Sequence, residues 1–205
     1  MAPVNEWFDE AFAACPVMAI LRGFSPDKTV ELSETAWDLG IDIVEVPIQS
    51  PDALDSLAAA TAAGQKRGRQ VGAGTVINRG QLEQAISRGA AFTVAPGFDA
   101  AVAQASIDAG LPHLPGVATS TEIQSALNLG LTWIKAFPAT SLGPGWFRAM
   151  HGPFPTLKIV ATGGMGTANA EEYLSAGASV IAVGSALEDP SQLDQLAKLA
   201  AGANK

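Results

Sequence analysis

The stretch "LKIVATGGMGTANAEEYLSAGASVIAVG" (157–184) contains two apolar, β-prone runs separated by a segment rich in Ala and Glu that ends on glycine. Short runs of β-branched residues predict strands, and the segment between them has the composition and spacing of a helix. A strand, a helix and a second strand in this order form a βαβ unit, whose two strands are parallel. The stretch therefore predicts an α/β fold built on a parallel sheet.

The same alternation recurs along the chain at intervals of roughly 20 to 25 residues, which is typical of repeated βα units. Eight such strands close a (β/α)8 TIM barrel, and a chain of 205 residues is at the compact end for that fold. An open, doubly wound sheet is the alternative. We expect one domain over 1–205, with an extra helix in 5–14 that covers the bottom of the barrel. The predicted strands are 17–21, 41–46, 70–74, 91–95, 112–117, 132–137, 157–162 and 179–184.

Composition excludes several classes of protein. The chain is 48% hydrophobic and 16% charged, so it can bury a sizeable core. Its net charge of −8 provides no basic surface for nucleic acid or an anionic membrane, and no apolar run approaches the roughly 18 residues of a membrane span. The first residues lack the basic and apolar regions of a signal peptide. With Cys15 as the one cysteine, we expect a cytoplasmic protein with no disulfide and no Cys-rich metal site.

Lys135 is the residue that the pattern explains least well. It lies near the end of the apolar run 132–137, and strand alternation places it on the same face as Trp133 and Phe137. In a TIM barrel the active site lies at the carboxyl ends of the strands. Apolar surroundings favour the neutral form of an amine, which can attack a ketone and form a Schiff base. The alternative is a lysine that is paired structurally with a carboxylate.

Glu45 ends another buried strand, 41–46, and alternation places it on the face of Ile43 and Pro47. Beside Lys135, its carboxylate could form only an ion pair. It could also move protons as a general acid/base during the formation and breakdown of a Schiff base. The two interpretations are compatible.

Two loops predict an anion site. Thr162, Gly163 and Gly164 follow the seventh strand and open a predicted helix, and Gly184 and Ser185 follow the eighth. Backbone N–H groups at a helix N-terminus favour an anion, and phosphate sites after strands seven and eight recur in TIM barrels. A lone Gly-Gly pair is usually only a turn, but two such loops in consecutive positions favour phosphate.

Four other positions carry weaker signals. Arg22 is the one arginine at a predicted strand end, so it is a candidate for binding a carboxylate or a phosphate. Thr75 follows a glycine-rich strand end, and Pro96 lies in "APGF", which could be no more than a tight turn. His113 has no partner at metal-ligand spacing and is interpreted as structural.

Taken together, the motifs "AILRG", "VEVPIQSP", "GAGTV", "APG", "LPGVATSTE", "IKAFPA", "TGGM" and "VGSAL" resemble the class I 2-keto-3-deoxy-6-phosphogluconate aldolase family over roughly 17–187. This resemblance implies a TIM-barrel aldehyde-lyase of Entner–Doudoroff-type metabolism. The family cleaves 2-keto-3-deoxy-6-phospho sugar acids to pyruvate and glyceraldehyde 3-phosphate, forms homotrimers and uses no metal or other cofactor. It implies Lys135 as the Schiff-base lysine, Glu45 as the acid/base, a pyruvate pocket of Thr75, Pro96 and Phe137, and a phosphate site of Thr162, Gly163, Gly164, Gly184 and Ser185.

The chain departs from the gluconate-type members of the family after Glu45. They carry an arginine there, whereas this chain has Pro47, Ile48 and Gln49, which resembles the branch acting on 2-keto-3-deoxy-6-phosphogalactonate. In that branch the arginine of the "ILRG" motif, here Arg22, serves the substrate carboxylate. The threonine of "TGGM" is instead typical of gluconate-type members. We favour the galactonate substrate; the alternatives are the gluconate acid, 4-hydroxy-2-oxoglutarate, and a phosphosugar isomerase, synthase or silent binding barrel.

Overall fold

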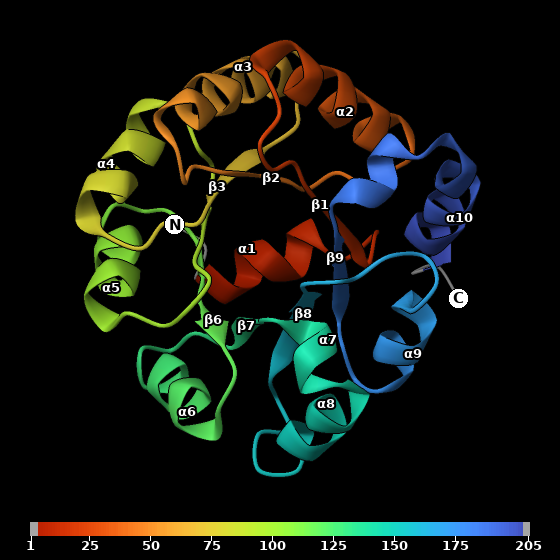
Figure 1. Cartoon of the computed structure of the whole chain (residues 1–205). Coiled ribbons are helices and arrows are strands. Elements are labelled where there is room, and N and C mark those ends of the chain that lie inside the picture. Colours follow the sequence, from red (N-terminus) through yellow and green to blue (C-terminus); the bar gives the residue numbers. More distant parts are fainter. Residues whose placement is uncertain (1–3, 203–205) are drawn as a thin grey trace.

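The computed structural model describes residues 4–202, in which a ring of helices surrounds a barrel of parallel strands (Figure 1). Hydrogen bonding joins the strands in the order β5-β4-β3-β2-β1-β9-β8-β7-β6, and each pairs in parallel with its neighbour. The predicted TIM barrel is confirmed. The strands are β1 Val17–Ile20, β2 Val44–Pro47, β3 Val71–Gly74, β4 Thr93–Val94, β5 His113–Leu114, β6 Gly116–Val117, β7 Trp133–Ala136, β8 Lys158–Thr162 and β9 Val180–Val183.

The structure has nine strands where eight were predicted, because Pro115 divides the run 112–117 into β5 and β6. Proline lacks the N–H that a strand needs to continue its ladder. On one side of this break β5 pairs with β4, and on the other side the Pro115 carbonyl accepts a 2.8 Å hydrogen bond from the backbone of Lys135. The same short segment thus contacts both edges of the sheet, which closes the barrel and excludes the open doubly wound alternative.

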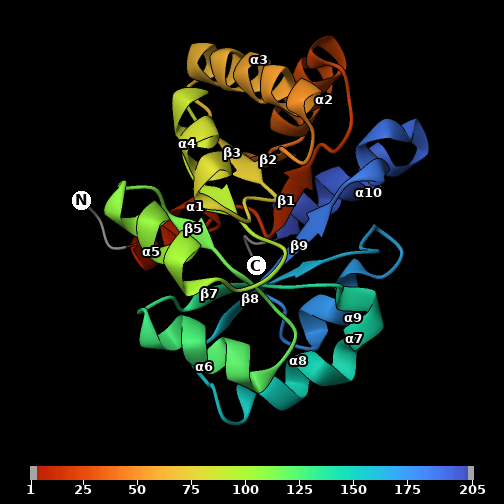
Figure 2. The same ribbon diagram turned by 60° about the vertical axis from the view of Figure 1, so that its left-hand side comes forward.

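Polar side chains cap several of the helices on the outside. Ser25, Asn78, Asp99 and Thr119 each accept a hydrogen bond from a backbone N–H of the helix that they precede, an interaction worth about 1 kcal/mol per helix. Figure 2 shows α2 and α3 on one side of the strands and α6 and α8 on the other. The helices are α1 Val4–Ala11, α2 Pro26–Asp38, α3 Pro51–Arg67, α4 Arg79–Ser87, α5 Ala100–Asp108, α6 Ser120–Asn128, α7 Ala139–Leu142, α8 Pro144–His151, α9 Ala170–Ser175 and α10 Pro190–Ala201, with a 3₁₀ turn η1 Ser185–Glu188.

Side chains of alternating strand residues form two separate cores. Those pointing outward, such as Ile134 and Ile159, pack under the helices, and burying each of these side chains contributes about 2 kcal/mol. Those pointing inward, such as Met18, Trp133 and Val160, fill the barrel itself. Trp133 and Ile134 lie in different cores, which confirms the predicted alternation along β7.

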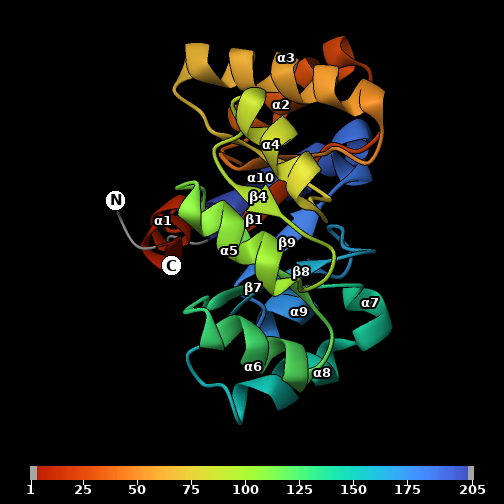
Figure 3. The ribbon, with the colours of Figure 1, turned by 90° about the vertical axis from the view of Figure 1, so that its left-hand side faces the viewer.

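Helix α1 closes the end of the barrel where the strands begin, as predicted for the N-terminal segment, although it ends at Ala11. Phe8 and Phe12 insert into the inner core against Trp133. Asp9 accepts a 2.7 Å hydrogen bond from the Trp133 indole and pairs with Lys158. Figure 3 shows α1 at one end of the barrel and α7 at the other.

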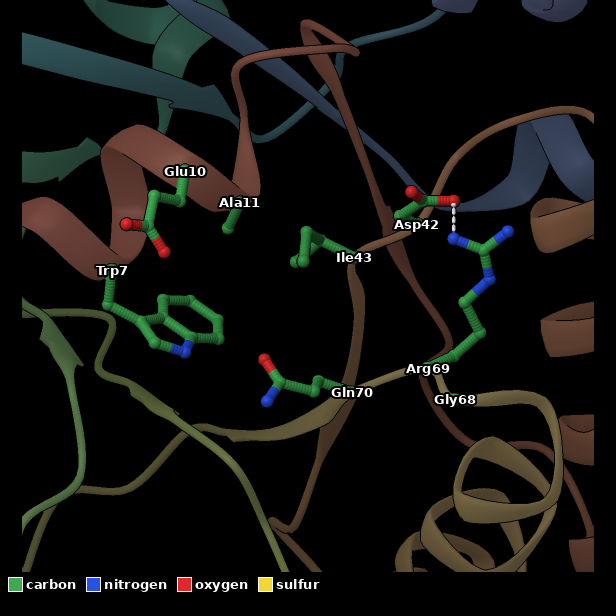
Figure 4. Close-up of a pocket in the computed structure, with 8 residues that line it drawn as sticks. All are labelled: Trp7, Glu10, Ala11, Asp42, Ile43, Gly68, Arg69 and Gln70. Carbon is green, nitrogen blue, oxygen red and sulfur yellow. Dashed lines mark ion pairs between the residues drawn. The ribbon is translucent and has the colours of Figure 1, made fainter.

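A cavity of about 370 Å³ lies beside α1 at the amino ends of β2 and β3 (Figure 4). Its charged groups neutralise each other in part, because Arg69 pairs with Asp42 at 2.5 Å. This is the stabilising face of a barrel rather than the face at which strand-end residues gather. The cavity is lined by Trp7, Glu10, Ala11, Asp42, Ile43, Gly68, Arg69 and Gln70.

Candidate active site

Lys135 and Glu45 meet inside the barrel. Lys135 extends from β7 and Glu45 from β2, and three strands separate these two in the sheet order. The lysine Nζ lies 3.5 Å from Glu45 Oε1, and the side chains are 3% and 0% exposed. A charged group is almost never fully buried without a partner. The structure therefore brings together the two residues that the sequence predicts as catalytic.

The polar atoms around this pair are not satisfied by the protein. Both carboxylate oxygens of Glu45 and the hydroxyl of Thr162 are buried and have no hydrogen-bond partner within residues 4–202. Such groups are rare in folded proteins because their desolvation is not repaid, and they are concentrated where a ligand completes the bonding. The Lys135 Nζ also lies 5.6 Å from the centre of the Phe137 ring. The buried pair thus places one amine beside one carboxylate, with the Phe137 ring facing the amine.

The glycines of β3 provide the space that Glu45 occupies. A Cβ at Gly74 would overlap the Glu45 carboxylate, and a Cβ at Gly72 would overlap the ring of Phe92. Strand β3 lies next to β2, with Glu45 opposite Gly72 in the register. The glycine-rich string "GAGTV" is therefore explained by packing inside the barrel, which sequence reasoning alone did not identify.

A cavity of about 320 Å³ opens at the carboxyl ends of β1, β8 and β9. Phe137 lines it and also faces the Lys135 amine, so the cavity lies next to the buried pair. It brings together seven of the predicted site residues: Arg22, Phe137, Thr162, Gly163, Gly164, Gly184 and Ser185. Sequence reasoning did not single out the remaining lining residues, which are Ile20, Phe24, Met165, Ala182 and Glu188.

Two glycines of the loop after β8 line this cavity. Gly163 and Gly164 have φ values of 101° and 72°, which L side chains rarely adopt. Their N–H groups and that of Ser185 donate no hydrogen bond to any residue in 4–202, so they are free to bind an anion. Arg22 is the one cationic side chain among the cavity's lining residues.

The helix predicted after this loop is present, but it begins beyond the two glycines. Helix α9 begins only at Ala170, because the Asn169 side chain donates to the Gly164 carbonyl and accepts from the Gly166 N–H, both at 3.0 Å. These bonds hold a turn between the glycines and the helix. The N–H groups of Gly163 and Gly164 therefore do not belong to a helix N-terminus.

The structure does not place Thr75 and Pro96 in the cavity with Arg22. Thr75 directly follows β3 with a φ of 58°, a strained value for a residue other than glycine. Pro96 contacts Gly116, which lies opposite Lys135 in the register of β6 and β7. Both residues thus lie beside strands that carry Lys135 or Glu45 or contact them. The glycine loops lie on the opposite side of this buried pair.

Residues 4–202 contain neither a cluster of metal-ligating side chains nor a membrane-spanning helix. No three His, Cys, Asp or Glu side chains in that range gather as a possible metal site. No helix in the described part of the chain is long and apolar enough to cross a membrane. The one cysteine, Cys15, is buried, and burial raises the pKa of its thiol to about 11, so it stays protonated near neutral pH.

Comparison with known proteins agrees with this geometry. Residues 8–201 match the family model described as "KDPG and KHG aldolase". This chain belongs to that family. It is thus an aldolase, which confirms the resemblance noted in the sequence and the predicted class of enzyme. The match spans the buried pair and both glycine loops.

Relatives within the KDPG and KHG aldolase family carry two different substrate names. The probable 2-dehydro-3-deoxy-6-phosphogalactonate aldolase of Rhizobium meliloti (strain 1021) is 33% identical over 85% of this chain and 82% of its own length. The 2-dehydro-3-deoxy-phosphogluconate aldolase of Pseudoalteromonas atlantica is also 33% identical, over 93% and 92%. The percentages of sequence identity therefore do not distinguish the galactonate substrate from the gluconate substrate.

A solved structure in the family shows the covalent chemistry. KDPG aldolase from Legionella pneumophila, captured with pyruvate as a covalent carbinolamine intermediate, is 28% identical to this chain and has a TM-score of 0.80. The similarity covers 95% of this chain and 97% of the other.

Proposed function

We propose that this aldolase cleaves 2-dehydro-3-deoxy-6-phosphogalactonate to pyruvate and D-glyceraldehyde 3-phosphate through a Schiff base on Lys135. The observation that carries the proposal is the buried Lys135–Glu45 pair, 3.5 Å apart, beside a cavity with unbonded loop N–H groups. An amine held next to a carboxylate in an apolar site has both functions that Schiff-base formation requires, a nucleophile and a proton carrier. The reaction needs no metal or other cofactor.

In the first half of the reaction, the neutral amine of Lys135 attacks the C2 ketone and gives a carbinolamine. Glu45 carries a proton to the departing hydroxyl, water leaves, and an iminium ion forms. Phe137, Thr75 and Pro96 enclose the pyruvate portion. The unpartnered hydroxyl of Thr162 is available to the substrate.

In the second half, the proton of the C4 hydroxyl passes to the Glu45 carboxylate. The electron pair of the C3–C4 bond moves into the iminium ion, which becomes an enamine, and the aldehyde leaves with its phosphate. Protonation at C3 and addition of water then release pyruvate and restore the lysine. Gly163, Gly164, Gly184 and Ser185 hold the phosphate through their N–H groups, the Ser185 hydroxyl adding a further donor.

The galactonate epimer is favoured because the residues available for the substrate carboxylate resemble those of the galactonate branch. Gln49 stands near the position at which gluconate-type members carry an arginine, so this chain lacks a cation there. Arg22 lines the cavity and forms no ion pair with any residue in 4–202, which leaves its guanidinium free for a carboxylate.

Cleavage of the two epimeric phosphorylated acids, measured side by side, tests this proposal. We expect a higher kcat/KM for the galactonate acid than for the gluconate acid. A higher value for the gluconate acid, or for 4-hydroxy-2-oxoglutarate, would favour the corresponding alternative within the family. Cleavage of neither acid, with binding retained, would identify a silent binding barrel.

Replacing Arg22 by alanine should raise the KM of the keto acid by roughly 10- to 100-fold and change kcat much less, because a charge-assisted hydrogen bond contributes about 1.5–3 kcal/mol to binding. Steady-state kinetics of the variant check this result. Arg148→Ala, which removes an exposed arginine of α8 outside the cavity, is the matched control. A change in thermal stability with unaltered KM would contradict the carboxylate role.

We further propose that residues 1–205 form a single catalytic domain that assembles as a cytoplasmic homotrimer. Residues 1–3 and 203–205 lie outside the described part of the chain. Light scattering in solution checks the trimer.

A further inference from the structure

The cavity beside α1, at the amino ends of β2 and β3, plays no part in the proposed reaction (Figure 4). It shares no lining residue with the cavity that contains Arg22 and the glycine loops. Its volume of about 370 Å³ lies within the range of roughly 300–1,000 Å³ in which proteins bind small molecules. Its walls combine an aromatic ring with acidic and amide side chains, a mixture that selects a ligand by charge as well as by shape.

Trp7 provides an aromatic ring that its neighbours hold in place. The ring packs edge-on against Phe8, with 4.9 Å between the ring centres, and at a tilt against Phe92, with 5.1 Å between them. The Trp7 side chain is nevertheless only partly buried, and Figure 4 shows its indole extending into the cavity. Among aromatic side chains, the indole attracts a cation most strongly, within about 6 Å of the ring centre. This wall of the cavity therefore favours a positive charge.

Glu10 places a negative charge beside this ring. It follows Trp7 by three residues on α1, a spacing that brings two side chains to the same face of a helix. The Glu10 side chain is exposed, lines the cavity and forms no ion pair with any residue in 4–202. Figure 4 shows its carboxylate on the same side of the cavity as the indole. A cation that rests on the Trp7 ring would thus also meet a carboxylate.

The opposite wall offers no site for an anion. Arg69 is the one cationic side chain among the lining residues, and its guanidinium pairs with Asp42 at 2.5 Å, the contact that is dashed in Figure 4. Because these two charges neutralise each other, Glu10 leaves the cavity with one net negative charge. The net charge of −8 on the whole chain has the same sign. An anion would have to displace Asp42 from Arg69 and would be repelled by Glu10.

We propose that this cavity is a second ligand site, which binds a small organic monocation with an alkylated ammonium group. The nitrogen lies over the Trp7 ring beside the Glu10 carboxylate, and the alkyl groups contact Ala11 and Ile43. A metal ion is a poorer fit, because no three His, Cys, Asp or Glu side chains gather anywhere in residues 4–202. None of the lining residues takes part in the aldol reaction, so binding here and cleavage of the keto acid can fail separately.

Calorimetric titration of the intact protein with choline tests the proposal. Choline is a quaternary ammonium, and 3,3-dimethylbutan-1-ol has the same shape with a carbon in place of the charged nitrogen. We expect choline to saturate one site per chain and the neutral alcohol to bind about 10-fold more weakly, the ratio that a cation–π contact and one carboxylate provide together. The indole ¹⁵N signal of Trp7 should shift on binding. That of Trp146, which donates to the Ala118 carbonyl and lies outside the cavity, should not.

Two glutamate variants of α1 form a matched pair. Glu10→Gln keeps the shape of the side chain and removes its charge, so it should weaken choline binding about 3-fold and leave the affinity for the neutral alcohol unchanged. Glu6→Gln removes the same charge from an exposed residue of the same helix that does not line the cavity. It should bind choline as the unaltered protein does. Trp7→Leu, which removes the ring, should lower the preference for choline over the alcohol by about 3-fold.

Several outcomes would overturn the proposal. One is the absence of saturable choline binding, and another is equal affinity of the unaltered protein for choline and the neutral alcohol. A third is an equal loss of choline affinity in Glu6→Gln and Glu10→Gln, because choline would then respond to the charge of the whole protein and not to the cavity. If Trp7→Leu does not fold, the ratio of the two ligands and the two glutamate variants, both at exposed positions, still decide.

Discussion

The Lys135→Ala protein should lose keto-acid cleavage and should form no borohydride-stable adduct with pyruvate. Within residues 4–202, the Lys135 amine is the one group that forms an ion pair with Glu45. No other lysine in this range is buried. Loss of a covalent nucleophile lowers kcat by about 10⁴-fold or more. The adduct, located by mass spectrometry of the trapped protein, should lie on the peptide that contains Lys135.

Stability must be measured alongside activity, because this substitution leaves Glu45 buried without its cation. Removing one partner of a buried ion pair costs about 3–5 kcal/mol. The double variant Lys135→Met with Glu45→Gln removes both charges and should recover most of the lost stability while remaining inactive. This comparison separates loss of chemistry from loss of fold.

Lys158→Ala provides the matched control for the trapping experiment. Lys158 lies at the start of β8, is 42% exposed and pairs with Asp9 at the closed end of the barrel. Its removal should leave both the adduct and the turnover intact. An adduct on a different lysine, or an active Lys135→Ala protein, would refute the Schiff-base proposal and favour a phosphosugar isomerase or synthase.

The faces on which Lys135 and Glu45 lie could be predicted from sequence because strand alternation is a local property of the backbone. Once Trp133 and Ile43 belong to the inner core, their neighbours two positions along must also point inward. The 3.5 Å separation of the two charges could not be predicted in the same way. It depends on the order and register of strands that are far apart in the sequence.

The features that escaped prediction depend on contacts between distant segments. The break at Pro115 becomes visible only when β4 and β7 pair with either side of it. The need for glycine at Gly74 comes from the Glu45 side chain on the neighbouring strand. The late start of α9 comes from the particular bonds of Asn169, although the same residue type is also an ordinary cap.

The Glu45→Gln protein should fold and bind pyruvate but turn over about 10²-fold more slowly or worse, the usual scale for loss of an acid/base group. Glutamine has nearly the same shape, so it fits the space beside Gly74 that a larger side chain would not. Its amide cannot take the proton of the C4 hydroxyl. Both oxygens of Glu45 lack a hydrogen-bond partner in the described protein, so the substitution breaks no hydrogen bond that holds the fold, but it removes the ion pair with Lys135, and the free energy of unfolding is therefore measured beside the activity.

Single-turnover kinetics with borohydride trapping locate the step that is lost. If Glu45 moves protons in cleavage, the variant should still accumulate a trapped adduct with the keto acid while aldehyde release slows. Glu188→Gln, an exposed carboxylate lining the same cavity, should turn over at the normal rate. An unchanged kcat in Glu45→Gln would instead make Glu45 only the ion-pair partner of Lys135. In that case the proton must travel through Thr162 or through water, because no other carboxylate in residues 4–202 is fully buried beside the amine.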